Sequence, residues 1–347
     1  MKILITGAGA LLGQGIIKSL RLSRSSYQII AADPDPRAVG LYWADRAYLL
    51  PLVTDPSYLE KIEFILQQER PDALLIGTDV ELMKLSLHRT DLEARYNTRV
   101  IVSSPEVVRT ADDKWLTFEF LRANGFPHPR SVLPGAVPEL IAECGFPLVV
   151  KPRHGARSVG TTLVYDEKEL TLALGLVVDP VIQECVGTPN EEYTSGLLVT
   201  NDTVHAVVTM RRDLRDGNTY RAYVQPESIF NPFLQKVAST LHPWGPVNLQ
   251  FRIDKGVPKI FEINARFSGT TPIRAYAGFN EVDALVRHIV RGEPIPEPSV
   301  QGIVVLRYFE EMVVDPTVMN SVTSGGPCEA LGFDQPFNPL RVSNRHT

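Results

Sequence analysis

The sequence predicts an α/β domain with a parallel sheet, followed by α+β structure. The first residues form an apolar run, a glycine-rich turn and a helical pattern, which is how doubly wound α/β domains begin. Near position 250, two short segments alternate apolar and polar residues, which is typical of strands with one buried face. The length of 347 residues allows two or three domains, and a hydrophobic content of 44% is enough for several cores.

The composition excludes several classes of protein. A net charge of -5 gives no general reason to expect nucleic-acid binding. The three cysteines, Cys144, Cys185 and Cys328, form no CxxC pair, which argues against a disulfide framework or a zinc site and favours a reducing compartment. No apolar run reaches transmembrane length, and Gly7 and Gly9 break the N-terminal run, unlike a signal peptide. We therefore expect a cytoplasmic protein that binds neither membranes nor nucleic acid.

The N-terminal segment has the pattern of a dinucleotide-binding fold with an imperfect glycine motif. An apolar strand, Lys2–Thr6, leads into GAGALLGQG, and a second strand, Tyr27–Ala32, ends at Asp33, where such folds place a ribose-binding acid. The glycine spacing in the turn departs from GxGxxG. We interpret the domain as Rossmann-like, with glycines that serve tight packing. An NAD(P)-binding reductase or sensor is kept as an alternative.

A further predicted strand, Ala73–Gly77, is followed by two acids, Asp79 and Glu81. Acids at the carboxyl ends of parallel strands line the crevice where ligands bind, so both are candidate contacts for an amine substrate. The simpler interpretation is that they cap and charge the first turn of a helix.

Two lysines and a glycine-rich loop follow. Lys114 begins a helical pattern, and by itself it would be a solvent-exposed helix charge. Lys151 directly follows the apolar strand Phe146–Val150, and a lysine attached to a buried strand needs a specific partner, because burying its charge unpaired is costly. The loop between Gly155 and Gly160 offers main-chain N–H groups that could wrap a phosphate.

A predicted hairpin comes next, formed by Tyr193–Val199 and Val204–Met210. It is followed by a cluster of arginines on a loop loosened by Gly217: Arg211, Arg212, Arg215 and Arg221. Arginines in such a cluster could grip a substrate carboxylate, and solvent-exposed surface is an equally good interpretation for each of them.

The two alternating segments are Val247–Ile253 and Val257–Asn264. A three-residue loop between them would pair Ile253 with Val257, so that Gln250 faces Ile260 and Asn248 faces Glu262. Even-numbered side chains of both strands would then share one face. That face carries Asn248, Gln250, Arg252, Glu262 and Asn264, and the core face carries Val247, Leu249, Phe251, Ile253, Phe261 and Ile263.

The polar face of these strands suits a hard cation beside phosphate. Oxygen ligands from carboxylates and amides suit Mg²⁺, which bridges substrate phosphates. Arg266 is also even-numbered, and its guanidinium group could bind a phosphate oxygen. An ordinary exposed sheet face is the alternative interpretation.

The motif NLQF…FEINAR resembles the metal-binding end of the ATP-grasp fold, and most of all the carbamoyl phosphate synthase branch of that superfamily. In that branch a glutamine, a glutamate and an asparagine bind two Mg²⁺, and an arginine follows. Gln250, Glu262, Asn264 and Arg266 occupy these positions, although the synthase usually has proline where this chain has Ala265. The synthase has two such modules and this chain has one, so carbamoyl phosphate synthesis is not implied.

The resemblance also assigns roles along the chain. It implies ATP-binding residues at Lys114, Lys151, Gly155, Ser158, Gly160, Glu184, Cys185, Val186 and Glu192, with the backbone of 185–186 at the adenine edge and Glu192 at the ribose. It implies metal ligands at Gln250, Glu262 and Asn264, and catalytic roles for Arg266 and Lys151. Substrate contacts are expected at Arg211, Arg212, Arg221 and Ser268, the last at the start of a helix capped by Thr271.

The implied domains are a Rossmann-like pre-ATP-grasp domain (1–108) and an ATP-grasp fold of two α+β subdomains that clasp ATP. The lid subdomain with the glycine-rich loop spans 109–190, and the subdomain with the metal site spans 191–314. Residues 315–347 are left unassigned, because they have little pattern.

The resemblance implies an ATP-dependent carboxylate–amine ligase that forms an amide or peptide bond through an acyl phosphate and releases ADP and phosphate. ATP and two Mg²⁺ (or Mn²⁺) are the implied cofactors, and small carboxylates and amines, above all amino acids, are the implied substrates. A homodimer is the assembly to test, since family members are often dimers. The other alternative is a bicarbonate-activating carboxylase or carbamoyl-phosphate-type enzyme.

Overall fold

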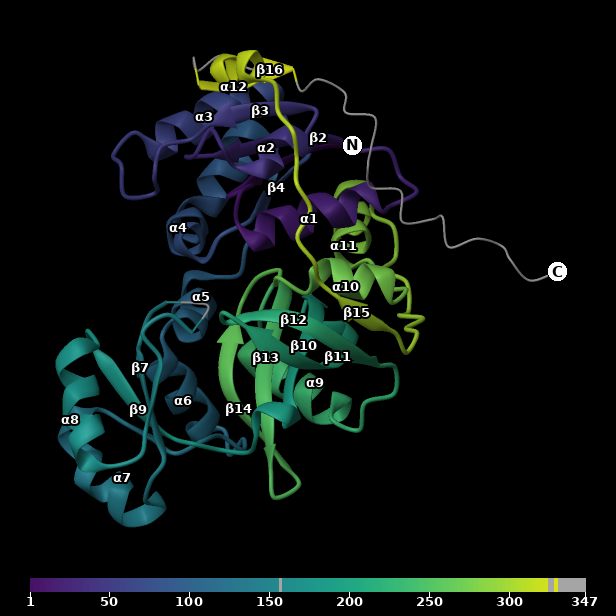
Figure 1. The fold of residues 1–347 in the computed structure, drawn as a ribbon. Coiled ribbons are helices and arrows are strands. Elements are labelled where there is room, and N and C mark those ends of the chain that lie inside the picture. Colours follow the sequence, from purple (N-terminus) through teal and green to yellow (C-terminus); the bar gives the residue numbers. More distant parts are fainter. Residues whose placement is uncertain (156–157, 324–327, 330–347) are drawn as a thin grey trace.

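The computed structural model describes residues 1–155, 158–323 and 328–329, which are built around three β-sheets (Figure 1). The first and third sheets have six strands each, and the second has four. The second sheet is formed by residues 131–184 and the third by residues 192–306. The predicted combination of α/β and α+β structure is confirmed, and the domain limits themselves stay a prediction. Within the described residues, no helix has the length and apolar composition needed to cross a membrane.

The first sheet is parallel except at one edge, with strand order β16-β3-β2-β1-β4-β5. Its elements are β1 (Lys2–Thr6), α1 (Leu11–Arg21), β2 (Gln28–Asp33), α2 (Val39–Trp43), β3 (Arg46–Leu49), α3 (Tyr58–Glu69), β4 (Ala73–Ile76), α4 (Asp79–Tyr96), β5 (Arg99–Ile101) and β16 (Cys328–Glu329). Side chains of β1 enter two cores in alternation: Ile3 and Ile5 pack on the side of α1, and Leu4 packs on the side of α3 and α4. Helices therefore cover both faces, as expected for a doubly wound domain.

The glycines after β1 allow close packing of the main chain. A Cβ atom at Gly13 would lie 2.2 Å from the carbonyl oxygen of Gly7. Asp33 accepts the N–H of Gly9 at 2.7 Å on one oxygen and the N–H of Asp35 at 3.0 Å on the other, and burial raises the pKa of its carboxyl group. The acid that a nicotinamide cofactor would need is thus bound to its own loop, which supports the packing interpretation.

The chain returns to the first sheet after the third. From β15 (Val304–Leu306) it runs back past α1 to α12 (Pro316–Thr323) and β16, which pairs antiparallel with β3 (Figure 1). Val322 is buried in the N-terminal core. Both α12 and β16 lie in the segment that the sequence analysis left unassigned. A two-residue edge strand such as β16 has no periodicity to detect.

The second sheet is antiparallel, with strand order β6-β9-β7-β8. It is preceded by α5 (Pro105–Asp112) and α6 (Lys114–Ala123), and contains β6 (Ser131–Val132), α7 (Val137–Cys144), β7 (Leu148–Pro152), β8 (Thr162–Val164), α8 (Glu167–Leu176) and β9 (Pro180–Glu184). Leu148 and Val150 pack against α7 and α8. Since side chains alternate along a strand, Lys151 points to the opposite face, toward the third sheet.

The third sheet has strand order β14-β13-β10-β11-β12-β15. Its elements are β10 (Glu192–Thr200), β11 (Thr203–Arg215), β12 (Asn218–Gln225), α9 (Asn231–Leu241), β13 (Gly245–Asp254), β14 (Val257–Asn264), α10 (Thr271–Tyr276), α11 (Glu281–Arg291) and β15. The predicted β10–β11 hairpin is confirmed. The predicted arginine-rich loop is wrong, because β11 continues to Arg215 and forms a second hairpin with β12 around Asp216-Gly217.

The predicted register of the β13–β14 hairpin is also wrong. Asp254 pairs with Val257, so the connection is the two-residue turn Lys255-Gly256, with φ angles of +51° and +82°. Turns with positive φ at both central residues match the twist of a hairpin. A bulge beside Gln250 then shifts the pairing, and Gln250 faces Glu262.

The bulge also changes which side chains enter the core. Ile260 is fully buried, whereas Phe261, predicted for the core face, is only half-buried. The ammonium nitrogen of Lys151 lies 5.8 Å from the centroid of the Phe261 ring. Past the bulge, even-numbered residues of both strands again lie opposite each other. The predicted polar face therefore survives, with partners shifted by two residues.

Candidate active site

Three polar side chains of the β13–β14 hairpin meet on one face of the third sheet. Asn264 donates from Nδ2 to Glu262 Oε1 at 2.9 Å, and Gln250 Nε2 lies 3.5 Å from the same oxygen. They are this close because the bulge sets Gln250 directly opposite Glu262. The structure therefore brings together the three residues predicted as metal ligands, which we call the Glu262 cluster.

The Glu262 cluster fits a magnesium ion that is held mainly by nucleotide phosphates. It contains one carboxylate and two amide oxygens, and the amide oxygens here accept from Arg212 and Arg266. Mg²⁺ in phosphoryl-transfer sites takes one or two carboxylates together with phosphate oxygens and water. Among the residues that the structure describes, no group of three or more histidines, cysteines and acids could hold a metal ion. A metal ion at Glu262 would therefore depend on the nucleotide for its remaining ligands.

Glu192 lies beside the cluster, buried between two arginines. Arg212 donates to one carboxylate oxygen at 2.7 Å, and Arg252 donates to the other at 2.9 Å. Arg212 also donates to Gln250 Oε1 at 2.5 Å. The sequence analysis did not predict these ion pairs, because Glu192 and Arg252 are brought together only by the pairing of β10 with β13. A ribose contact by Glu192 stays a prediction.

Lys151 is buried, with 5% of its surface exposed. Its Nζ donates to Gln183 Oε1 at 2.8 Å and lies 3.3 Å from the carbonyl oxygen of Phe261. Burial lowers the pKa of Lys151 to about 7, and the Glu262 carboxylate partly opposes this shift. An anion bound beside Lys151 would favour its charged form.

Lys114 starts α6 and is tied to the beginning of the glycine-rich loop. Its Nζ donates to the carbonyl oxygen of Gly155 at 2.8 Å, and Asp113 caps the helix. Gly155, Ser158 and Gly160 have φ angles of +120°, +56° and +73°. Residues 156–157 lie outside the described part of the chain, so the loop's phosphate contacts stay a prediction.

The segment 184–186 connects the second and third sheets. The Glu184 carboxylate pairs with Lys259 at 3.2 Å, and the carbonyl oxygen of Val186 accepts from Arg252 at 3.4 Å. Burial raises the pKa of the Cys185 thiol, which makes it a poor nucleophile. These contacts fit a hinge, and the predicted adenine contact is not tested by them.

Two of the predicted substrate arginines do not join the Glu262 cluster. Arg211 pairs with Asp213 at 2.8 Å and stacks on Tyr223, 3.9 Å from the ring centroid. Arg221 lies 3.8 Å from the same aspartate. Because side chains alternate along β11, Arg211 faces away from Arg212, which alone of these three arginines reaches the cluster.

Ser268 lies in a buried network below the loop that follows β14. Arg274 and Glu281, each 1% exposed, form an ion pair at 2.5 Å, and Arg274 donates to Ser268 Oγ at 3.0 Å. The predicted cap, Thr271, is the first helical residue, and Thr270 holds the cap position. The Ser268 hydroxyl is thus used to hold the loop in place.

Gly196 in β10 leaves room for this network. A Cβ atom there would lie 2.3 Å from Cζ of Arg274. We expect Gly196→Ala to displace the guanidinium from Glu281 and to lower the free energy of unfolding by about 3 kcal/mol or more, because breaking a buried ion pair leaves an uncompensated charge. The control is Gly175→Ala in α8, where an added Cβ meets no atom within 4 Å. Equal denaturation midpoints of the two variants would contradict this expectation.

Arg266 links the Glu262 cluster to the N-terminal domain. It is 9% exposed, and it donates from Nη2 to Asn264 Oδ1 at 2.8 Å and from Nε to Asp79 Oδ1 at 2.7 Å. Glu81, the other acid noted at this strand end, is 5% exposed and accepts hydrogen bonds from three hydroxyl groups of its own domain. Asp79 is therefore the acid that contacts Arg266.

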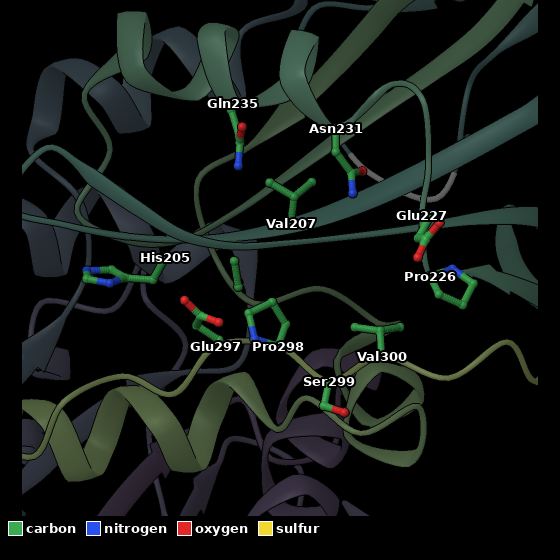
Figure 2. Close-up of a pocket in the computed structure, with 11 residues that line it drawn as sticks. His205, Val207, Pro226, Glu227, Asn231, Gln235, Glu297, Pro298, Ser299 and Val300 are labelled. Carbon is green, nitrogen blue, oxygen red and sulfur yellow. The ribbon is translucent and has the colours of Figure 1, made fainter.

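A separate hollow of about 510 Å³ lies beside α9 (Figure 2). It is lined by His205 and Val207 of β11, by Asn231 and Gln235 of α9, and by the segment 297–300. None of these residues belongs to the Glu262 cluster, so this hollow is not part of the candidate active site.

Two family descriptions match the chain. Residues 3–101 match the family described as PylC-like, N-terminal domain. Residues 182–312 match the family described as ATP-grasp in the biosynthetic pathway with Ter operon, and this range includes the whole Glu262 cluster. The chain contains an ATP-grasp domain. The ATP-grasp resemblance found in the sequence is thereby confirmed.

Known proteins similar to this ATP-grasp chain include both synthases and ligases. The carbamoyl phosphate synthase large chain of Thermus thermophilus is 32% identical over 200 residues, which are 52% of this chain and 19% of that relative. The 3-methyl-D-ornithine–L-lysine ligase of Methanosarcina barkeri is 23% identical over 287 residues, covering 80% and 72% of the two chains. The crystal structure of N5-carboxyaminoimidazole synthetase from Staphylococcus aureus complexed with ADP has a TM-score of 0.66 at 16% identity, covering 88% of this chain and 79% of the other.

Proposed function

We propose that this ATP-grasp protein is an ATP-dependent carboxylate–amine ligase, which forms an amide or peptide bond through an acyl phosphate and releases ADP and phosphate. The observation that carries the proposal is that the Glu262 cluster is hydrogen-bonded to Arg266, and that buried Lys151 of the second sheet reaches the Phe261 carbonyl oxygen next to Glu262. This arrangement offers oxygen ligands for Mg²⁺ and two cations for phosphate oxygens. The similarity to a ligase named for two amino acids supports a carboxylate and an amine as substrates.

The proposed nucleotide site follows from the same geometry. Lys114, Lys151 and the loop 155–160 would hold the phosphates, the segment 184–186 would meet the adenine, and Glu192 would accept the ribose hydroxyls. Gln250, Glu262 and Asn264 would hold two Mg²⁺, and these ions would reduce the repulsion between the phosphates and an incoming carboxylate.

The proposed reaction has two steps. In the first, a carboxylate oxygen of the acid substrate attacks the γ-phosphorus of ATP and the bond to the ADP oxygen breaks, while Lys151 and Arg266 stabilise the charge on the transferring group. In the second, the amine nitrogen attacks the acyl carbon, the C–O bond to phosphate breaks, and the proton lost by the nitrogen passes to the departing phosphate. Closure of the loop over the site would protect the acyl phosphate from water.

Amino acids are the proposed substrates. Among the predicted arginines, Arg212 lies at the site, but its guanidinium is bound to Glu192 and Gln250, so a substrate carboxylate would have to compete with them. A homodimer stays a prediction, which analytical ultracentrifugation of the purified chain tests.

The deciding experiment measures nucleotide release in the presence of Mg²⁺ and hydroxylamine, with a panel of amino acids and other carboxylates. We expect ADP and a hydroxamate to appear together with at least one acid, because hydroxylamine traps an acyl phosphate. Release of AMP would contradict the proposed chemistry. Release of ADP that depends on bicarbonate, with no amino acid present, would instead identify a bicarbonate-activating enzyme.

A further inference from the structure

Arg266 depends on two neighbours for its orientation. Its Nε donates to Asp79 Oδ1 and its Nη2 donates to Asn264 Oδ1, at 2.7 Å and 2.8 Å. Only 8% of the Arg266 side chain is exposed, against 28% for Asp79. Within the described residues, Asp79 is the carboxylate that pairs with this guanidinium. The two groups lie 187 positions apart in sequence: Asp79 begins α4, and Arg266 follows β14.

The two contacts differ in what happens when ligands bind. Asn264 Oδ1 is a proposed metal ligand, and a cation beside this oxygen would repel the guanidinium. Asp79 is not a proposed metal ligand, and its contact with Nε uses neither Nη group of Arg266. The Asp79 contact is therefore the one that can hold Arg266 while metal and nucleotide are present.

Asp79 is itself held by a rigid element. It is the first residue of α4, an 18-residue helix that directly follows β4 and its connecting residues. Leu82 and Leu85, about one and two turns further on, are buried in the core between this helix and the first sheet. A carboxylate on the first turn of a helix that is packed along one side has little freedom to move, so it can fix the direction of its partner.

We propose that Asp79 is a positioning residue, which holds the Arg266 guanidinium so that its Nη groups face the terminal phosphate of ATP. The N-terminal domain would thereby take part in phosphoryl transfer through a single ion pair. This inference rests on the proposed function, because it takes Arg266 as a phosphate contact. It adds a role for the N-terminal domain that nucleotide binding by the ATP-grasp domain does not require.

The test compares two nucleotides by calorimetry in the presence of Mg²⁺: ADP and the non-hydrolysable ATP analogue AMP-PNP. Asp79→Asn keeps the shape of the side chain and removes its charge. We expect it to weaken AMP-PNP binding by about ten-fold or more, in the range for a lost charge-assisted hydrogen bond, and to change ADP binding by less than about two-fold. Only AMP-PNP carries the terminal phosphate that Arg266 would contact.

The matched control is Asp91→Asn, the same chemical change in the same helix. Asp91 pairs with Arg95 at 3.2 Å on the exposed side of α4, where 57% of its side chain is accessible. This variant should bind both nucleotides as the wild type does.

A double-mutant cycle with Arg266→Met separates positioning from a structural role. If Asp79 acts through Arg266, then Asp79→Asn should cause no further loss of AMP-PNP affinity in the Arg266→Met background. Weaker binding of ADP and AMP-PNP alike, in both backgrounds, would mean that Asp79 only docks the domains, and would overturn the inference. If Asp79→Asn binds both nucleotides as Asp91→Asn does, the positioning role of Asp79 is refuted and the proposed function is unaffected. If the wild type binds neither nucleotide, both the positioning role and the proposed function are refuted.

Discussion

Glu262→Gln should abolish ADP release while leaving the fold intact. Glu262 is the carboxylate of the cluster, and glutamine keeps its shape and can still accept from Asn264, but it carries no charge for a metal ion. We expect the rate of acid-dependent ADP release to fall by at least about a thousand-fold, because positioning and charge stabilisation supply most of the catalysis in phosphoryl transfer. The free energy of unfolding should change by less than about 1 kcal/mol, since the side chain is only half-buried.

The control for this variant is Glu60→Gln, which changes an exposed acid on α3. It should keep wild-type ADP release. Rates and urea denaturation curves of the three proteins can be compared directly. Turnover retained by Glu262→Gln would refute the metal assignment, and loss of activity together with loss of folding would assign Glu262 to stability instead.

The parts of the site that local sequence patterns predicted are those that lie on one hairpin. Alternation placed Gln250, Glu262 and Asn264 on a common face, and the structure agrees. The pairing between the strands was wrong, because the turn is two residues long and a bulge follows. Both features depend on backbone geometry that periodicity does not report. The face survived because side-chain direction depends on parity, and a shift of two residues conserves parity.

The parts that the sequence did not predict are contacts between distant segments. Glu192 meets Arg212 and Arg252 only because β10 lies between β11 and β13 in the sheet. Arg266, which follows β14, meets Asp79 at the start of α4, a contact across 187 positions of sequence. In both cases the residue types alone suggested a ligand contact, and the fold supplied an internal partner that no single segment of sequence contains.

Binding of Mg–ATP should take up a proton above neutral pH, because of Lys151. The pKa of Lys151 is lowered to about 7 by burial, so at pH 8 the side chain is mostly neutral when no nucleotide is bound. Phosphate oxygens beside it would favour the charged form. Binding at pH 8 should therefore be linked to uptake of close to about one proton, and binding at pH 6 to almost none. Calorimetry in buffers of different ionisation enthalpy measures this number.

Lys151→Met should remove this proton uptake and weaken nucleotide binding by about a hundred-fold, in the range expected when a buried charge–phosphate contact is lost. Lys168→Met changes an exposed lysine on α8 and should leave both quantities as in the wild type. Proton uptake that persists in Lys151→Met would place the titrating group elsewhere.

The lowered pKa of Lys151 also predicts that this residue, which should strengthen nucleotide binding, lowers the stability of the folded protein. Between about pH 7 and pH 10 the unfolded chain carries a proton on Lys151 that the folded protein has lost, so the free energy of unfolding rises with pH in this window. Below pH 7 the cost of burying the charge is fully present. Lys151→Met should therefore be more stable than the wild type at pH 6, by on the order of a few kcal/mol, and the difference should shrink toward pH 10. Urea denaturation across this range measures it. If Lys151→Met is less stable than the wild type at pH 6, the hydrogen bond of Lys151 to Gln183 outweighs the cost of burying its charge. If the variant is more stable but binds nucleotide more weakly, Lys151 is a cation that the protein keeps in its core in order to bind the ligand.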